Sequence, residues 1–253
     1  MQKLLAATVV LGAGLAFAQV KETADIAVNG SVDVFSAYVW RGQVLNNGLV
    51  AQPSLTLEKM GFSLELWSNY NIDGTNGRED TDFTEIDFKL AYQIPVTTDD
   101  FSLQVGLIHY TFPESKGQEG WKDTTELFVS AVFPSIILNP TIDIYYDCDQ
   151  GKGWYGSFGL SHTFELSDAL DFTLGGSIGY AESGFAQASY GDTANSGWND
   201  YNVYASASYA LTDKLSLGAK IAYTVLDDSY ADRDEYDAAG DLIWGGVSLS
   251  YQF

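Results

Sequence analysis

The chain ends with the stretch IWGGVSLSYQF, which covers residues 243–253. Apolar and polar side chains alternate along most of it: Ile243, Val247, Leu249, Tyr251 and Phe253 lie in one phase, and Ser248, Ser250 and Gln252 lie in the other. A period of two residues is the side-chain period of a β-strand. We therefore predict a strand over 242–253 with one apolar and one polar face, ending on an aromatic residue.

Strand character recurs through the rest of the chain, and the connections alternate between short and long. Further strands are predicted at residues 26–41, 49–58, 61–73, 83–94, 101–112, 124–133, 140–148, 154–166, 170–181, 200–211 and 215–226. Longer connections are predicted at 42–48, 74–82, 113–123, 149–153, 181–199 and 227–241, with short turns elsewhere. This alternation over an even number of strands is typical of a membrane barrel with short periplasmic turns and long outer loops.

Aromatic residues of the apolar phase gather at two levels of the predicted strands. Near the outer ends are Tyr38, Trp40, Tyr70, Tyr146, Trp154, Tyr180, Tyr201 and Tyr223. Near the periplasmic ends are Phe62, Tyr92, Phe101, Phe133, Phe164, Phe172, Tyr209, Tyr251 and Phe253. Two such belts suit the two lipid–water interfaces, whereas a soluble β-sandwich with the same period has no use for aromatic rims. The predicted fold class is therefore all-β, a transmembrane antiparallel up-and-down β-barrel of about 12 strands.

The first residues have the composition of a secretory signal peptide. Lys3 supplies a positive charge, a short apolar run follows, and Ala16-Phe17-Ala18 is a small-x-small cleavage site. The apolar run is shorter than the roughly 20 residues that a retained membrane helix needs. We predict a signal peptide over 1–18, a barrel domain over 19–253, and location in the bacterial outer membrane.

Charge and motif content exclude several classes of function. The 34 acidic residues outnumber the 12 basic ones, which gives a formal net charge of −22 and makes nucleic acid a poor partner. Cys148 is alone, so no internal disulfide framework is possible. Phosphate-binding loops and zinc spacings are absent, and we expect no cofactor and no metal. Calcium binding by the acidic stretch 227–241 stays open, although its spacing is not that of an EF-hand loop.

The polar phase of the strands is mainly acidic. The residues predicted to line the lumen are Asp33, Arg41, Glu65, Trp67, Asn69, Glu85, Asp87, Lys89, Glu126, Asp143, Asp147 and Lys220. An acidic lining favours cations. The leading hypothesis is a porin-like channel for small polar or cationic solutes, with the long loop 182–199 as a candidate gate. The alternative is a structural or interaction barrel without flux, its interior filled by salt-bridged side chains.

A lipid-modifying barrel enzyme is the third hypothesis, and the histidines argue against it. Such enzymes act through a Ser–His pair on the lipid-facing surface. His109 and His162 both fall on the outward phase, but they are predicted near opposite rims and neither begins a His-x-Ser motif. We therefore expect that the protein is not an enzyme.

Residues 36–43, with the sequence SAYVWRGQ, resemble the first strand end in a family of uncharacterised Gram-negative outer-membrane proteins. Its members have a Tyr-Val-aromatic-Arg-Gly strand end, a short loop and a Gln-Pro-like second strand, here Gln52-Pro53. The resemblance implies a porin-like barrel but brings no established substrate or catalytic residue. Porins specific for acidic sugars line their lumen with bases, and this chain departs from that pattern. Arg41 could pair with a lumen carboxylate near the outer mouth, either as a plain salt bridge or as a solute contact.

The expected partners follow from the predicted barrel. Its outer face would contact outer-membrane lipid and lipopolysaccharide, and its interior would receive small solutes. The closing strand, ending at Phe253, would be the segment that the barrel-assembly machinery recognises.

Overall fold

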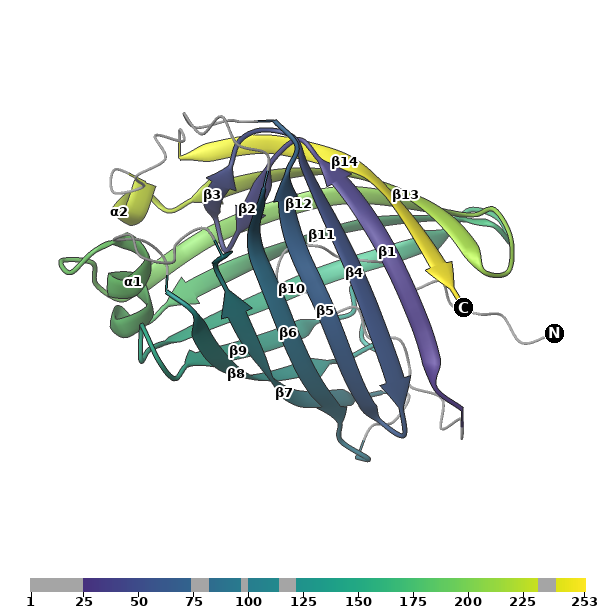
Figure 1. Ribbon diagram of the computed structural model, residues 1–253, viewed down its shortest axis with the longest axis horizontal. Helices are drawn as coiled ribbons and strands as arrows, with labels where there is room; N and C mark the ends of the chain where they lie inside the picture. The colour runs from purple at the N-terminus through teal and green to yellow at the C-terminus, as the bar shows by residue number, and fades with distance from the viewer. Residues whose placement is uncertain (1–24, 74–81, 97–99, 114–121, 232–239) are drawn as a thin grey trace.

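Twelve antiparallel strands close into a barrel in the part of the chain that the computed structural model describes, residues 25–73, 82–96, 100–113, 122–231 and 240–253 (Figure 1). The barrel strands are β1 (Ala27–Phe35), β4 (Val50–Lys59), β5 (Phe62–Asn71), β6 (Phe83–Gln93), β7 (Ser102–Thr111), β8 (Thr124–Val132), β9 (Thr141–Asp147), β10 (Trp154–Glu165), β11 (Leu170–Ala181), β12 (Gly197–Ala210), β13 (Leu215–Leu226) and β14 (Asp241–Gln252). The predicted signal peptide over 1–18 lies outside these residues.

The barrel closes between its first and last strands. Asn29 of β1 pairs with Gln252 of β14, and on its other side β1 pairs with β4, from Ala27 opposite Glu58 to Phe35 opposite Val50. Every other barrel strand pairs with its neighbours in chain order. The predicted all-β, twelve-stranded, antiparallel architecture is confirmed. A soluble two-sheet sandwich is excluded because the sheet has no free edge.

The barrel is apolar on its outer surface. On β14, Val247, Leu249 and Tyr251 are each at least 40% exposed, whereas Ser248 and Ser250 between them are only partly exposed. Outward leucine, isoleucine and valine side chains repeat this pattern on the other strands. An apolar band around a closed sheet, in which every strand is paired on both sides, is what lipid requires.

Aromatic side chains form belts at both ends of this band. At the periplasmic end, ring pairs include Phe62 with Tyr92 at 4.5 Å and Tyr251 with Phe253 at 4.9 Å. At the outer end, Tyr180 lies between Trp154 and Trp198, with ring centroids 5.5 and 5.6 Å away.

Two members predicted for the outer belt do not belong to it. Tyr38 and Trp40 lie on a short strand that leaves the barrel wall, and the Tyr38 side chain is buried. The prediction for these two residues was wrong because the chain turns away from the wall before it reaches them.

The two ends of the barrel differ in their connections. The turn between β4 and β5 needs only Met60 and Gly61, with φ values of 51° and 84°, which suit a two-residue hairpin turn. The opposite end carries two helices, α1 (Ser183–Tyr190) and α2 (Asp228–Ala231) (Figure 1). No helix among the described residues is long and apolar enough to cross a membrane.

The first predicted strand, 26–41, is corrected by the structure. The wall strand β1 ends at Phe35, and residues 38–46 form a separate hairpin of β2 (Tyr38–Trp40) and β3 (Gln43–Asn46). Residues 42–48 are therefore not an exposed outer loop, since most of them are buried.

Candidate functional site

The β2–β3 hairpin lies inside the barrel. It leaves the wall at Phe35 and rejoins it at Val50, two residues that face each other on adjacent strands. Tyr38 contacts β5 and β6 on one side, while Arg41 contacts β8, β9, β10 and β12. Only a segment within the closed sheet can reach so many separate strands of the wall. We call residues 36–49 the inner hairpin.

The tip of the inner hairpin is a two-residue turn made by Arg41 and Gly42. Their φ values are 47° and 84°, the left-handed backbone that suits tight hairpins. A Cβ on Gly42 would lie 2.7 Å from Cβ of Asp200 and 2.9 Å from Cδ1 of Leu226. Both the backbone conformation and the close approach to the wall therefore require glycine at this position.

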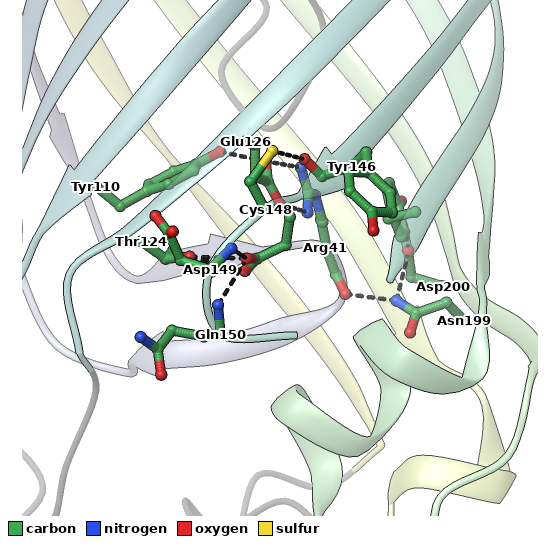
Figure 2. Close-up of polar contacts among 12 residues, drawn as sticks. Arg41, Tyr110, Thr124, Glu126, Tyr146, Cys148, Asp149, Gln150, Asn199 and Asp200 are labelled. Carbon is green, nitrogen blue, oxygen red and sulfur yellow. Dashed lines mark hydrogen bonds and ion pairs between the residues drawn. The ribbon is translucent and has the colours of Figure 1, made fainter. Parts of the chain in front are cut away.

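Arg41 forms a two-pronged ion pair with Glu126 of β8. Nη1 and Nη2 donate to the two carboxylate oxygens, each at 2.7 Å, and both side chains are almost fully buried (Figure 2). The hydroxyl of Tyr110 on β7 donates to the same carboxylate at 2.8 Å. Glu126 is thus oriented from the wall, and paired N–H donors match the planar carboxylate.

Four aromatic rings surround the Arg41 guanidinium. Its Cζ lies 4.4 Å from the ring centroids of Trp40 and Tyr145, 4.6 Å from that of Tyr155, and 5.2 Å from that of Phe185. All four distances are within the range of a cation–π interaction, which is strengthened when water is excluded. Tyr145 comes from β9, Tyr155 from β10 and Phe185 from α1.

The backbone of the hairpin tip is also held by the wall. Nδ2 of Asn199 donates to the Arg41 carbonyl at 2.7 Å, a contact visible in Figure 2. The Tyr190 hydroxyl of α1 donates to Oδ1 of the same asparagine at 2.9 Å. Asp200 beside it accepts from the Tyr155 hydroxyl at 2.7 Å. One polar network therefore joins the hairpin tip, β10, β12 and helix α1.

The base of the inner hairpin has its own anchor. The Tyr38 hydroxyl donates to Oε2 of Glu85 on β6 at 2.9 Å, and its ring packs 5.6 Å from that of Trp67 on β5. Asn46 ends β3, and its side-chain oxygen accepts from the Gly48 amide at 2.6 Å. Anchors at both tip and base give the hairpin a defined position rather than a loose fit.

Helix α1 covers the hairpin tip from the outer end of the barrel. Its N-cap is Glu182, whose carboxylate accepts from the Gly184 amide at 2.9 Å. Hydrogen bonds from Ser183 and the Gly184 backbone lower the pKa of Glu182, so the cap stays ionised in neutral solution. On the other side of the helix, the Tyr190 ring stacks on Tyr230 of α2 at 4.5 Å. The two helices and the inner hairpin therefore pack as one unit.

Below the hairpin, the inward side chains include small hydroxyl groups and two lysines. Ser31 and Ser54 are hydrogen-bonded to each other at 2.8 Å, as are Thr163 and Thr173. Lys89 lies 3.4 Å from Glu65, and Lys220 lies over the rings of Tyr204 and Trp244. Several of these inward side chains, including Ser31, Glu65 and Lys89, retain partial solvent exposure, unlike the core around Arg41.

The structure places the twelve sequence-predicted lining residues as follows. Seven are buried: Asp33, Arg41, Asn69, Glu85, Glu126, Asp143 and Asp147. Five are partly exposed: Glu65, Trp67, Asp87, Lys89 and Lys220.

Direct contacts join some of these residues but not all. Arg41 meets Glu126, and Lys89 meets Glu65. Asp143 accepts from Ser130 and Ser157, while Asn69 belongs to an amide network with Gln52 and Asn71. Asp147 instead organises its own loop, accepting from the amides of Asp149 and Gln150 at 2.7 and 2.9 Å.

Sequence reasoning missed the aromatic and amide half of the site. Tyr145 stands between Asp143 and Asp147 in the inward phase of β9, so the alternation itself contained the signal. Tyr155 follows the outward Trp154, so alternation likewise indicates that its side chain points inward. Phe185 and Asn199 lie in the stretch 182–199 that was predicted as a loop, where no period indicates a direction.

Two further predictions concern the two histidines and the acidic stretch 227–241. Nδ1 of His109 lies 3.1 Å from the Thr125 hydroxyl, and the His162 ring packs 4.6 Å from Phe164, so each histidine has separate neighbours. Residues 232–239 of the acidic stretch lie outside the described residues. Within the described ranges no group of three or more metal-ligating side chains comes together.

Solved outer-membrane channels share this fold. The NanC porin aligns with a TM-score of 0.52 at 13% identity, covering 90% of this chain and all of that one. An outer-membrane channel from Pseudomonas putida F1 (COG4313) aligns at 0.54 and 10% identity, covering 90% and 95%. The KdgM porin aligns at 0.54 and 10% identity, covering 90% and 99%. At these identities the likeness concerns the fold alone.

The comparisons and the lipid-suited exterior together describe a porin-like barrel of the bacterial outer membrane. No curated protein matches the chain. The resemblance noted at residues 36–43 is confirmed at the level of the whole chain. The family described as "Bacterial protein of unknown function (Gcw_chp)" matches residues 19–244, and the chain belongs to this family.

Proposed function

We propose that the protein is an outer-membrane channel for small polar or cationic solutes, held closed here by the inner hairpin. One observation supports this most strongly: a segment that is not part of the wall occupies the barrel interior and bridges separate wall strands, β8 and β12, through Arg41. A barrel that only needed a filled interior could fill it with wall side chains.

The hairpin can leave without breaking the barrel. Phe35 and Val50, at its two ends, are already paired across β1 and β4, and those strands form a continuous ladder down to Ala27 and Glu58. Release of the inner hairpin would therefore disrupt its side-chain contacts and two flanking backbone bonds, from the Ser36 amide to the Gly245 carbonyl and from the Ile72 amide to the Leu49 carbonyl. It would leave the pairing of β1 with β4 intact. This separation between wall and plug is the physical requirement for a gate.

The charge of the wall favours cations. Arg41 sits on the hairpin, so its departure would remove a base and leave Glu126 uncompensated. The wall retains Lys89 and Lys220 as inward bases, against a larger set of carboxylates: Asp33, Glu65, Glu85, Asp87, Glu126, Asp143, Asp147 and Asp200. A narrow passage lined in this way attracts cations and repels anions.

Single-channel recording tests the proposal. In one variant, residues 36–49 are replaced by Asn-Gly, a pair that makes a two-residue hairpin turn between Phe35 and Val50. The wild-type protein should conduct weakly or in brief openings, and the variant should conduct steadily. If the variant folds, as judged by heat-modifiable gel mobility, and yet carries no current, the protein is a structural or interaction barrel instead.

We also propose that the closing strand directs assembly. Phe253 is 68% exposed at the periplasmic belt, and its amide donates to the Val28 carbonyl at 3.0 Å, which fixes the strand end beside β1. Phe253→Ala should lower the yield of assembled barrel in the outer membrane. Phe62→Ala, which removes an equally placed belt ring, is the control and should assemble normally.

A further inference from the structure

We propose that the pocket around the Arg41 side chain is a receptor site for solutes that carry a guanidinium group. In the closed state the chain's own Arg41 occupies this site and excludes the solute. The inference rests on the proposed channel function, and it names the class of cation that the channel would select.

The site provides what a guanidinium needs. Glu126 offers both carboxylate oxygens to two parallel N–H donors at 2.7 Å. Planar rings lie around the Cζ atom at 4.4 to 5.2 Å, so the weakly hydrated faces of the cation are covered. An ammonium group is compact and cannot form the same parallel pair of hydrogen bonds, so this geometry distinguishes the two kinds of cation.

Nearly all of the site belongs to the wall and the helix, not to the hairpin. Glu126, Tyr145, Tyr155 and Phe185 lie outside the inner hairpin, and only Trp40 would leave with it. Their positions do not depend on Arg41 alone. Tyr110 holds the Glu126 carboxylate, and Asp200 holds the Tyr155 hydroxyl. A departing hairpin would therefore leave a preorganised site, which reduces the entropy lost when a ligand binds.

The tethered Arg41 does not satisfy every donor in the site. Its Nε is buried without a hydrogen-bond partner among the described residues, while both Nη atoms are paired with Glu126. A free guanidinium is not restrained by the turn at Arg41 and Gly42, and it can orient independently of the hairpin. In the wild-type protein it has to compete with the tethered side chain, so its apparent affinity falls by the fraction of time that the hairpin is released.

Binding of methylguanidinium to purified protein in detergent tests the inference. Arg41→Ala vacates the site, and isothermal titration should show binding at least about tenfold tighter than to the wild-type protein. Methylammonium at equal ionic strength should bind the same variant about tenfold more weakly, because it cannot form the parallel hydrogen bonds. Adding Glu126→Gln to Arg41→Ala should abolish binding of methylguanidinium. A folded Arg41→Ala barrel that binds neither cation, or binds both equally, overturns the proposal.

A second pair of measurements covers the case in which Arg41→Ala does not fold. Arg41→Gln keeps a polar side chain at the turn and removes the tethered guanidinium, so it should bind methylguanidinium more tightly than the wild type. In wild-type channels, methylguanidinium should raise the open probability relative to sodium at equal ionic strength. Equal open probabilities in the two cations would contradict the proposal. Titration needs no current, so a silent barrel that still binds methylguanidinium would refute the channel and leave the receptor site standing.

Discussion

Arg41 combines a left-handed backbone with a buried charge, and each is unfavourable on its own. A positive φ at a non-glycine residue costs about 1–2 kcal/mol, and burying an unpaired cation costs several kcal/mol more. The ion pair with Glu126 and the surrounding rings offset both penalties only while the hairpin is docked. The same contacts that make the closed state stable therefore make it sensitive to single substitutions.

Removing the negative partner should release the hairpin. Glu126→Gln leaves a buried cation without its counter-charge, which destabilises such sites by about 3–5 kcal/mol. Trypsin cleaves after arginine, and Arg41 is protected while it is 4% exposed. We expect cleavage after Arg41, followed by mass spectrometry, to accelerate by about 100-fold or more, since each 1.4 kcal/mol is a factor of about ten.

A partly exposed pair provides the matched control for this substitution. Glu65 also pairs with a base, Lys89, but at 3.4 Å and with both side chains partly exposed. Such pairs contribute about 1 kcal/mol or less. Glu65→Gln should leave the cleavage rate after Arg41 nearly unchanged, and equal effects of the two substitutions would refute a special role for the Arg41–Glu126 pair.

The glycine after Arg41 offers a second test of hairpin docking. Gly42→Ala adds a Cβ that meets Asp200 and Leu226 at less than 3 Å and also strains a φ of 84°. We expect a loss of about 2–5 kcal/mol in docking free energy, from the left-handed penalty and overpacking together. Gly191→Ala is the control because its φ is 97° and, in the part of the chain that the structure describes, nothing lies within 4 Å of its added Cβ. If trypsin cleaves after Arg41 at the same rate in both variants, the tight fit at Gly42 does not contribute to hairpin docking.

For single residues, the sequence predicts which charged side chains point into the barrel better than it predicts which of them pair. The inward phase of Asp143 and Glu126 follows from alternation, because a strand leaves each side chain only two directions. Arg41 is buried for a different reason, since it lies in the turn of the inner hairpin. The pairing of Arg41 with Glu126 requires knowledge of how far the hairpin reaches across the barrel. No local pattern contains that distance, so the partner could not be chosen among several predicted carboxylates.

Among the elements, the inner hairpin is the one that alternation cannot reveal. Aromatic and apolar residues continue past Phe35 through Tyr38 and Trp40 with the same period, so a straight strand and a returning hairpin have the same signature. The local sign of a hairpin turn is the pair Arg41-Gly42, in which a glycine follows a residue with positive φ. Met60-Gly61 makes a tight turn elsewhere in this chain with almost the same φ values.

Helix α1 should control release of the hairpin, because Phe185 packs against Trp40 at 5.9 Å. A Cβ on Gly151 would lie 3.1 Å from Cβ of Ala188 on α1, close to the roughly 3.5–4.5 Å of a disulfide. In a Cys148→Ser background, the oxidised Gly151→Cys/Ala188→Cys variant should protect Arg41 from trypsin better than the reduced form. Each single-cysteine variant is the control and should not respond to reduction. Equal protection in both redox states of the double variant would show that α1 does not control release of the inner hairpin.

The barrel as a whole is the part that the sequence predicts most completely. Lipid outside and polar groups inside impose a two-residue period on the wall strands. The predicted boundaries of the strand at 215–226 match β13. Departures occur where that constraint ends: β12 begins at Gly197, and the preceding stretch folds into a helix over the lumen.

The reversal potential tests most directly whether this barrel is a cation-selective channel closed by its inner hairpin. The barrel with residues 36–49 replaced by Asn-Gly would be recorded in a planar bilayer under a KCl gradient. The acidic wall predicts a reversal potential displaced toward the potassium equilibrium potential. Displacement toward the chloride potential, or steady wild-type currents equal to those of the variant, would contradict the account.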